Sequence, residues 1–333
     1  MKTALVTGVS GQDGSYLAQH LLRQGYHVVG CVRDTARAAA ALQALGIAGV
    51  ELRRWDPHDQ ASLGQILSDV RPQEVYNLAA FASGAGMFDD PVEMGHVNGL
   101  LVARWLQAIH QVDPAIRFCQ ASSSEMFGDA LASPQSEATP MRPRTPYGAA
   151  KQYGHAMVQI YRQRFGLFAC SAILFNHESP RRGLGFVTRK ITHQAARIKL
   201  GLASGLCLGD LGARRDWGHA ADSVRAMWLM LQQALPDNYV VSTGQTHSVR
   251  ELCEIVFGHL GLDYREHVSS GVQEFRAPET VQLVGDPGHA RATLGWAPTV
   301  GFAAMLVEMV EGDLAQLSPT GPDETRLEYD QSL

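Results

Sequence analysis

The chain has 333 residues, of which 45% are hydrophobic and 18% charged, as is typical of a folded globular protein. Its formal net charge of −5 argues against nucleic acid or an anionic membrane as a partner. No run approaches the 18 apolar residues of a membrane span, and the opening MKTALVTG indicates a buried strand, not a signal peptide. The five cysteines lie far apart without a Cys-x-x-Cys pair, so we expect buried thiols, no metal site and a cytoplasmic location.

The first half of the chain alternates short apolar runs with amphipathic segments. Strands are predicted at 3–6, 27–32, 49–53, 75–79, 117–122 and 169–175. Helices are predicted at 15–23, 37–45, 60–68 and 92–109, and a further helix begins at Thr145-Pro146 and ends at Gly166. This alternation indicates βαβ units and therefore an α/β fold, a Rossmann-type doubly wound parallel sheet.

Beyond residue 175 the alternation loosens. Helices are predicted at 187–200, 219–233, 249–259 and 302–314, and short strands at 206–208 and 239–241. We predict a Rossmann domain over residues 1–175 and a smaller C-terminal α/β substrate-binding lobe over 176–315. No clean linker separates the two, so we expect them to be interleaved. Residues 316–333 are polar and are predicted to form a loose tail.

A glycine-rich turn separates the first strand from the first helix. Its pattern is Gly-x-x-Gly-x-x-Gly, which lets backbone N–H groups approach a pyrophosphate at a helix N-terminus. The alternative is that these glycines serve only a tight turn. In a strand–turn–helix context the pattern favours dinucleotide binding. The predicted cofactor-binding residues of the turn are Gly8, Val9, Gly11, Gln12, Asp13 and Gly14.

Residues after the next strands refine the expected cofactor. Arg33 follows the second strand, where an NAD site usually has an acid, so NADP is favoured over NAD, although Asp34 and Arg37 lie close by. Asp56, followed by Pro57, is placed to hold the adenine amino group, or is an ordinary turn acid. Small or apolar residues close the fourth strand, where backbone packs on a cofactor: Leu78, Ala79 and Ala80.

A catalytic group is predicted from two segments. Tyr147 and Lys151 are four residues apart, so they share one helix face, and we expect the ammonium to lower the tyrosine pKa. Ser123 follows the fifth strand and offers a hydroxyl to the same substrate oxygen. Glu125 adds a second proton-transfer group, suited to removing a proton next to a ketone, unless it is a solvated loop residue.

Several motifs together resemble the GDP-mannose 4,6-dehydratase family of the extended short-chain dehydrogenase/reductase superfamily, over residues 1 to about 315. They are TGVSGQDGSYLA (7–18), ASSSEMFG (121–128), PRTPYGAAK (143–151), ILFNHESPRRG (173–183) and RDWGHA (215–220). The resemblance implies that Ser123, Glu125, Tyr147 and Lys151 are catalytic. It also implies that Tyr147, Lys151, His177 and Arg182 contact the cofactor. The implied substrate-binding residues are Ser123, Glu125, Asn176, Val187, Lys190, Arg215, Arg276 and Glu279.

The resemblance further implies conversion of GDP-D-mannose to GDP-4-keto-6-deoxy-D-mannose by internal hydride transfer through bound NADP, in a homodimer or homotetramer. Two departures keep alternatives open. Phe81-Ala82-Ser83-Gly84 replaces a polar Gln-Ser pair, and segment 33–37 lacks paired arginines. A dehydratase of another GDP-sugar such as a heptose, a reductase or an epimerase is therefore considered, as is a catalytically idle NADP-binding sensor or scaffold.

Overall fold

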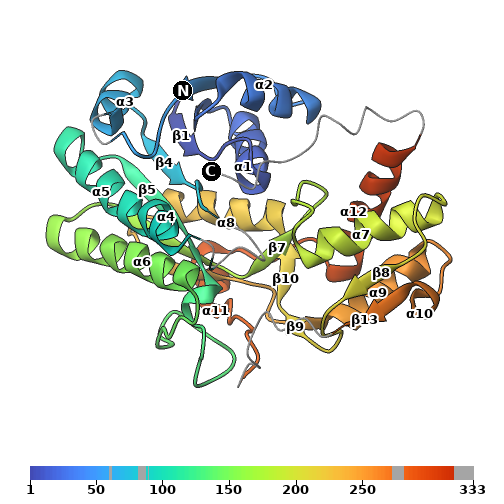
Figure 1. Cartoon of the computed structure of the whole chain (residues 1–333). Helices are drawn as coiled ribbons and strands as arrows, with labels where there is room; N and C mark the ends of the chain where they lie inside the picture. The colour runs from blue at the N-terminus through green and yellow to red at the C-terminus, as the bar shows by residue number, and fades with distance from the viewer. Residues whose placement is uncertain (60–61, 82–87, 89, 272–280, 319–333) are drawn as a thin grey trace.

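Seven parallel strands form the central sheet of the computed structural model, which describes residues 1–59, 62–81, 88, 90–271 and 281–318. The strand order is β11-β6-β5-β4-β1-β2-β3, and each neighbouring pair is parallel (Figure 1). The strands are β1 (Thr3–Thr7), β2 (His27–Val32), β3 (Val50–Arg54), β4 (Glu74–Asn77), β5 (Arg117–Ser123), β6 (Ala169–Leu174) and β11 (Asn238–Val241). The predicted doubly wound parallel sheet is confirmed.

Helices cover both faces of this sheet (Figure 1). One face carries α1 (Gln12–Arg23), α2 (Thr35–Ala44), α8 (Ala220–Gln232) and α11 (Gly288–Leu294); the other carries α3 (Ser62–Val70), α5 (Leu101–Val112) and α6 (Pro146–Phe165). Successive side chains of a strand point to opposite faces. Val6 of β1 accordingly packs with Leu17 of α1, whereas Leu5 packs in the cluster that contains Trp105 of α5.

The long helix predicted at 92–109 is confirmed as one continuous helical run, but a π-helical segment interrupts its α-helical hydrogen bonding, which was not predicted. The chain forms α4 (Pro91–Gly95), a π-helical segment η1 (His96–Leu100) and then α5. Asn98 of η1 is buried, and its amide donates to the Phe81 carbonyl and accepts from the Phe81 N–H, each at 3.0 Å. A π-helical segment inside an α-helix often occurs at a functional site. Here it turns Asn98 toward the segment after β4, which apolar periodicity alone does not reveal.

The helix that carries the predicted catalytic tyrosine has the expected ends. The Thr145 hydroxyl accepts from the Gly148 N–H at 3.0 Å, and Pro146 occupies the first turn of α6. Gly166 ends the helix with a φ of 69°, the left-handed conformation that glycine adopts without a steric penalty. These predicted boundaries are confirmed.

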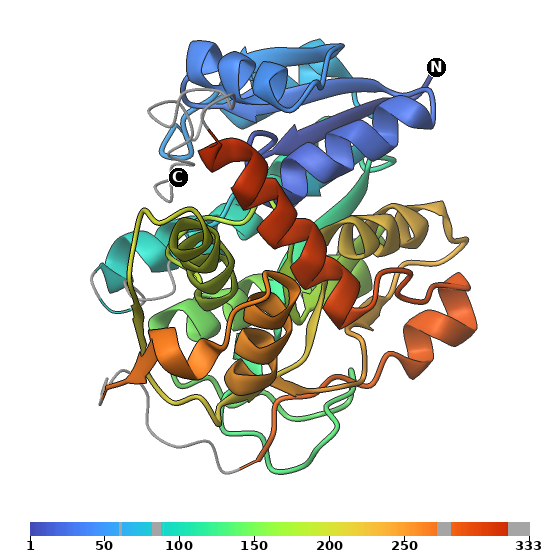
Figure 2. The same cartoon turned by 90° about the vertical axis from the view of Figure 1, so that its right-hand side faces the viewer.

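A second lobe has its own apolar core, formed by α7 (Val187–Lys199), α9 (Val249–His259) and α12 (Phe302–Leu317). Figure 2 shows α12 crossing this lobe diagonally. Short elements complete it: β7 (Asn176–Glu178) pairs with β10 (Trp217–His219), β9 (Arg214–Arg215) with β12 (His247–Ser248), and β8 (Leu206–Leu208) with β13 (Val268–Ser270), next to α10 (Tyr264–His267). Most of these short elements were not predicted, because two or three residues carry no periodicity.

The chain returns from the second lobe to the central sheet. Residues of α8, β11 and α11 share an apolar cluster with β1 and α1, although they follow residue 175. The domain boundary at 175 stays a prediction. The predicted tail begins too early, because α12 continues to Leu317; residues 319–333 lie outside the described residues.

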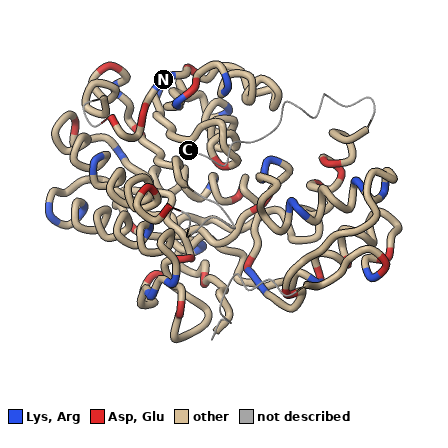
Figure 3. The backbone as a smooth tube through the Cα atoms, in the orientation of Figure 1, with Lys and Arg blue, Asp and Glu red and all other residues tan. Residues whose placement is uncertain are grey.

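Two further expectations concern thiols and membranes. All five cysteines are free, and Cys31, Cys119, Cys170 and Cys253 are buried. Cys207 is exposed, against expectation, because alternate residues of the short strand β8 point outward. Within the described part of the chain, no helix is both long and apolar enough to cross a bilayer. Figure 3 shows acidic and basic residues intermixed over both lobes.

A buried ion pair joins α12 to α7. Arg189 Nη2 lies 2.6 Å from Asp313 Oδ1, and the two side chains are 6% and 0% exposed. His193 of α7 also lies 3.4 Å from the same oxygen. Removing one partner leaves the other charge buried without compensation, which typically costs about 3–5 kcal/mol.

We therefore expect Asp313→Ala to lower the free energy of unfolding by about 3–5 kcal/mol in urea titration, because Arg189 stays buried. The double variant Arg189→Met/Asp313→Leu replaces the pair with apolar groups and should recover most of the loss. Equal stability of Asp313→Ala and the wild type would contradict this assignment.

Candidate active site

Buried hydrogen bonds join the carboxyl ends of β1 and β4 to the middle of β5. The Thr7 hydroxyl donates to Asn77 Oδ1 at 2.8 Å and accepts from the N–H groups of Leu78 and Ala79 at 3.0 and 2.9 Å. Asn77 Nδ2 donates to Gln120 Oε1 at 2.7 Å. Sequence reasoning did not single out Thr7, Asn77 or Gln120, although polar residues inside apolar strands were a usable signal. They fix the sheet edge at which ligands bind in this topology.

The glycine-rich turn lies at this edge, between β1 and α1. Gly8 has a φ of 67°, and a Cβ there would lie 3.1 Å from the Ala79 nitrogen. A Cβ on Gly14 would lie 2.1 Å from the Gly8 carbonyl oxygen. Only glycine therefore fits either position, and the turn keeps a bare backbone before the N-terminus of α1. This cradle fits the pyrophosphate of a dinucleotide.

Three side chains of the turn contact other parts of the protein: Gln12 and Asp13 contact His177, and Val9 packs in the core. Gln12 Nε2 donates to the His177 carbonyl at 3.1 Å, and an Asp13 oxygen lies 2.9 Å from His177 Nε2. Val9 is fully buried and packs under Gly30, where a Cβ would lie 2.4 Å from Val9 Cγ1. Because these three side chains are engaged elsewhere, we predict that Val9, Gln12 and Asp13 contact the cofactor only through their backbone atoms.

The residues predicted to select the cofactor lie after β2 and β3. Arg33 is exposed directly after β2. The Asp34 carboxylate accepts from the Arg37 N–H at 3.0 Å and caps α2. Asp56 accepts from the His58 N–H at 2.9 Å in a tight turn, with Pro57 buried beside it.

The structure brings the four predicted catalytic residues together from three elements, β5, the single turn η2 (Ser124–Met126) and α6. Ser123 ends β5, and Glu125 lies in η2; Ser123 Oγ accepts from the Glu125 N–H at 3.2 Å. Tyr147 lies in the first turn of α6 and its hydroxyl is hydrogen-bonded to Ser123. Lys151 lies one turn later, and its Nζ donates to the Ala121 carbonyl at 2.9 Å.

Burial dominates the pKa values of the tyrosine and the lysine. It raises the pKa of Tyr147 to about 12, although the hydrogen bond from Ser123 acts in the opposite direction. It lowers the pKa of Lys151 to about 8. The expectation of a lowered tyrosine pKa is therefore wrong for this state of the protein. The physical reason is burial of the Tyr147 hydroxyl. The Lys151 ammonium does not offset it, since it faces the Ala121 carbonyl and lies 5.6 Å from the Tyr147 ring centroid.

Gly148 sets the separation between α6 and the turn that carries the glutamate. A Cβ at this position would lie 2.5 Å from the Glu125 carbonyl oxygen, closer than real Cβ atoms approach backbone. Gly148 follows Tyr147 directly. The absence of a side chain here therefore lets Tyr147 and Glu125 share one site.

The predicted substrate residues lie along the second lobe. Asn176 begins β7 opposite Trp217 of β10, and Val187 begins α7. Lys190 Nζ donates to the Cys207 carbonyl at 3.1 Å, and Arg215 Nη1 donates to the Arg214 carbonyl at 2.7 Å. Arg276 and Glu279 lie outside the described residues, as do Ala82, Ser83 and Gly84.

Arg182, predicted to contact the cofactor, is held by two neighbours. Its guanidinium carbon lies 3.4 Å from the centroid of the Phe186 ring. Its Nε lies 3.2 Å from Oε2 of the buried Glu178. The side chain is therefore fixed at the start of the second lobe.

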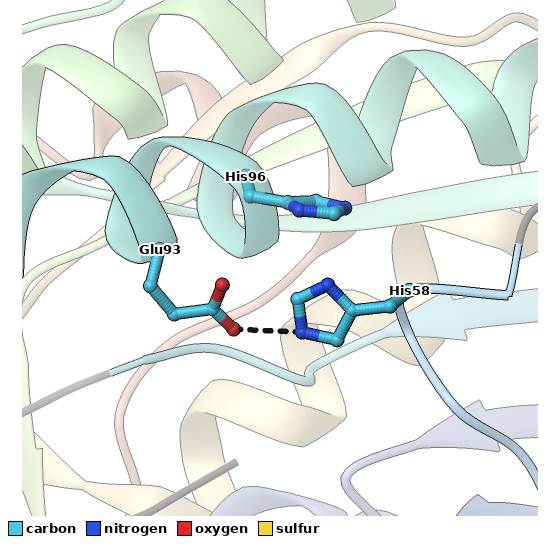
Figure 4. Close-up of side chains that lie close together, drawn as sticks. All are labelled: His58, Glu93 and His96. Atoms are coloured by element: carbon cyan, nitrogen blue, oxygen red, sulfur yellow. Dashed lines mark hydrogen bonds and ion pairs between the residues drawn. The ribbon is translucent and has the colours of Figure 1, made fainter.

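A histidine–carboxylate cluster lies near the turn after β3 (Figure 4). His58 Nε2 lies 3.0 Å from Glu93 Oε1, and the His96 ring is 4.5 Å from that of His58. A divalent cation needs the lone pairs of both imidazoles, but Arg104 Nη1 lies 2.7 Å from His96 Nε2 and donates to it. We therefore interpret the cluster as a hydrogen-bonded contact that joins this turn to α4.

A doubly wound sheet with a glycine cradle, a Tyr-x-x-x-Lys pair and a second lobe defines an enzyme of the extended short-chain dehydrogenase/reductase type. The family model described as GDP-mannose 4,6 dehydratase matches residues 5–309. GDP-mannose 4,6 dehydratase 1 of Arabidopsis thaliana is 46% identical, over 94% of this chain and 90% of its own length. The chain belongs to the GDP-mannose 4,6-dehydratase family, as its motifs indicated.

Solved structures share the fold. RMD of Pseudomonas aeruginosa, complexed with NADPH, has a TM-score of 0.79 at 24% identity, covering 95% of this chain and 100% of that one. The UDP-glucose 4-epimerase of Thermus thermophilus, complexed with NAD, has a TM-score of 0.79 at 26% identity, covering 93% and 98%. Both lobes of the present chain therefore follow a shared architecture.

We expect Gly148→Ala to lower turnover by about ten- to a hundredfold, because the new methyl group pushes Tyr147 away from Glu125, and small misplacements of reacting groups are costly. Gly64→Ala, also within a helix but with nothing within 4 Å of its Cβ, should leave turnover unchanged. Turnover and circular dichroism should be measured for both. Full activity of Gly148→Ala would contradict the close approach.

Proposed function

We propose that the chain converts GDP-D-mannose into GDP-4-keto-6-deoxy-D-mannose and water. The observation that carries the proposal is the convergence of Ser123, Glu125, Tyr147 and Lys151 at the carboxyl edge of the sheet. A reductase or epimerase needs the hydroxyl, the tyrosine and the lysine, whereas Glu125 adds the base that a dehydration requires. Family membership supports the same reaction.

The proposed cofactor is NADP. The glycine cradle fits a dinucleotide, and the structural relatives hold NADPH or NAD, which supports a nicotinamide cofactor. Arg33 favours the 2′-phosphate of NADP. The neighbouring Asp34 is not free to bind ribose hydroxyls as the acid of an NAD site does, because its carboxylate caps α2. When bound, the nicotinamide would accept a hydride from C4 of the sugar and later return it to C6.

Tyr147 acts on the sugar 4-hydroxyl in this proposal. Its phenolate oxygen takes the hydroxyl proton as C4 is oxidised, and Ser123 donates a hydrogen bond to the same substrate oxygen. Burial raises the pKa of Tyr147 to about 12, so the phenolate needs a compensating positive charge. In this proposal the Lys151 ammonium, 5.6 Å from the Tyr147 ring centroid, supplies this charge by turning from the Ala121 carbonyl toward the phenolate.

Glu125 carries out the elimination. The ketone at C4 makes the C5 proton acidic, and the Glu125 carboxylate removes it. The proton then passes to the 6-hydroxyl, which leaves as water. Once the hydride is back on C6, C5 takes up a proton, and the proton that Tyr147 took from the 4-hydroxyl balances it. Atoms and charge therefore balance without an external acid or base.

The second lobe is the proposed binding site of the sugar nucleotide, over residues 176–315. A diphosphate carries about two negative charges, which Arg and Lys side chains bind well. Lys190 and Arg215 are the basic candidates from this lobe, together with Arg276. Asn176, Val187 and Glu279 complete the proposed set.

We also propose a homodimer or homotetramer. Tyr153 and Ile160 are seven residues apart on α6, so they share one face, and their side chains are exposed. Leu100 of the adjacent segment η1 is exposed as well. A cytoplasmic location is proposed from the five free cysteines, since a reducing compartment keeps thiols unpaired.

Incubation of the purified protein with GDP-mannose and no added cofactor should lower the substrate mass by one water, because the hydride returns within one turnover. Glu125→Gln should abolish this loss while keeping bound cofactor, which extraction and mass spectrometry would identify as NADP. Glu254→Gln, an exposed glutamate of α9, should behave as wild type.

Two outcomes would contradict the proposal. Equal dehydration by Glu125→Gln would remove the base assigned here. No reaction of the wild type with GDP-mannose, in the presence of bound NADP, would point to another GDP-hexose or a heptose, or to a reductase. The residues to screen next would be those from Phe81 to Gly84.

The pH dependence follows from the lysine. Its pKa is lowered to about 8, so the ammonium is present below that pH and is lost as pH rises through it. We expect kcat/KM to fall above about pH 8 in the wild type and in Lys199→Met, an exposed control on α7. Lys151→Met should be slow at every pH, without this limb. An unchanged limb in Lys151→Met would assign it to another group.

A further inference from the structure

We infer that Asp13 is a positioning residue that holds His177 as an imidazolium cation and thereby locks the second lobe onto the cofactor turn. The inference deepens the proposed function, on which it rests for the role of His177 beside the cofactor. It starts from the contacts between the turn after β1 and the strand β7, which are 160 or more residues apart in sequence.

The hydrogen bonds of the His177 ring determine its charge. Nδ1 lies 2.7 Å from the Phe175 carbonyl oxygen, and Nε2 lies 2.9 Å from Asp13 Oδ2. A carbonyl oxygen and a carboxylate can only accept. Both ring nitrogens must therefore carry a proton, which makes the ring a cation.

The charged groups around the ring support this state. Burial by itself lowers the pKa of His177, but the Asp13 carboxylate outweighs burial and raises it, against a smaller opposing effect of Arg182. Burial likewise raises the pKa of Asp13, but His177 and Arg182 lower it overall. The ion pair is therefore complete above the lowered pKa of Asp13 and below the raised pKa of His177.

Gln12 fixes the backbone of the same strand. Its Nε2 donates to the His177 carbonyl at 3.1 Å, and its Oε1 accepts from the Ser179 hydroxyl at 2.9 Å. Arg181 extends the contact along α1, where its guanidinium lies 3.8 Å from the Tyr16 ring centroid and donates to Ser15 at 3.1 Å. The latch formed by Gln12, Asp13, His177 and Ser179 thus engages both ring and backbone of His177.

The latch couples the two halves of the site. Asp13 belongs to the glycine cradle of the first lobe, whereas His177 follows Asn176 at the start of the second. The Asp13 carboxylate also acts on two catalytic groups. Burial lowers the pKa of Lys151, and Asp13 raises it; burial raises the pKa of Tyr147, and Asp13 raises it further. Its loss therefore changes the charge of the site as well as the separation of the lobes.

The decisive experiment is NMR of the ¹⁵N-histidine-labelled full-length protein across a pH titration, with the His177 signals assigned by their loss in His177→Gln. The wild type should show an imidazolium at pH 6 and titrate above the ordinary value of about 6.5. Asp13→Asn should titrate below it. In the same variant, the alkaline limb of kcat/KM should move to lower pH, because Lys151 loses a neighbouring negative charge.

Asp237→Asn is the matched control, since Asp237 also pairs with a histidine, His289, at 3.1 Å. It directly precedes the edge strand β11, whereas the glycine-rich turn follows β1, so the two lie at opposite ends of the parallel strands. It should leave the His177 titration and the kcat/KM profile unchanged. In Asp13→Asn we expect kcat/KM to fall by about tenfold or more, because His177 is no longer held in place beside the cofactor and small misplacements in a site lower the rate strongly.

The wild-type titration can overturn the inference without any variant, so the test remains valid if Asp13→Asn fails to fold. A neutral His177 at pH 6 in the wild type would refute the inference. So would an Asp13→Asn protein whose His177 titrates as in the wild type. Absence of GDP-mannose dehydration by the wild type would refute the proposed function and leave the NMR result standing. The two failures are therefore distinguishable.

Discussion

The buried hydrogen bonds that link Thr7, Asn77 and Gln120 are the interaction on which the site depends. They tie the ends of β1 and β4 to the middle of β5 inside an apolar sheet, where an unsatisfied polar group is costly. Because Thr7 also accepts from the backbone after β4, the cradle formed by Gly8 is held against Ala79. The cofactor turn and the catalytic strand β5 therefore have one fixed geometry.

The same apolar setting determines the acid–base properties of the site. Tyr147 and Lys151 are both pushed by burial toward their neutral forms, with pKa values of about 12 and about 8. Proton transfer from the tyrosine to bulk water is thus unfavourable, and the substrate hydroxyl becomes a more suitable partner. The chemistry depends on charges placed nearby, among them the Asp13–His177 pair, which spans both lobes.

The second lobe is held by ionic contacts in addition to its own core. Arg189 and Asp313 pair inside it, joining α7 to α12. Asp13 and His177 pair at its boundary with the first lobe. The returning elements α8 and β11 then bury apolar side chains against the central sheet. The Arg189–Asp313 pair thus stabilises the second lobe itself. The Asp13–His177 pair and the returning elements hold that lobe against the central sheet, which suits a site assembled from both.

The sequence by itself determined the sheet class, the glycine cradle, the ends of α6 and the grouping of Ser123 and Glu125 with Tyr147 and Lys151. These features depend on local periodicity, capping residues and strand order, which a sequence carries directly. Only the tertiary structure decided the direction of the Tyr147 pKa shift, the π-helical segment at Asn98 and the contact between Asp13 and His177. Burial and long-range hydrogen bonds set all three, and neither is encoded in the spacing of neighbouring residues.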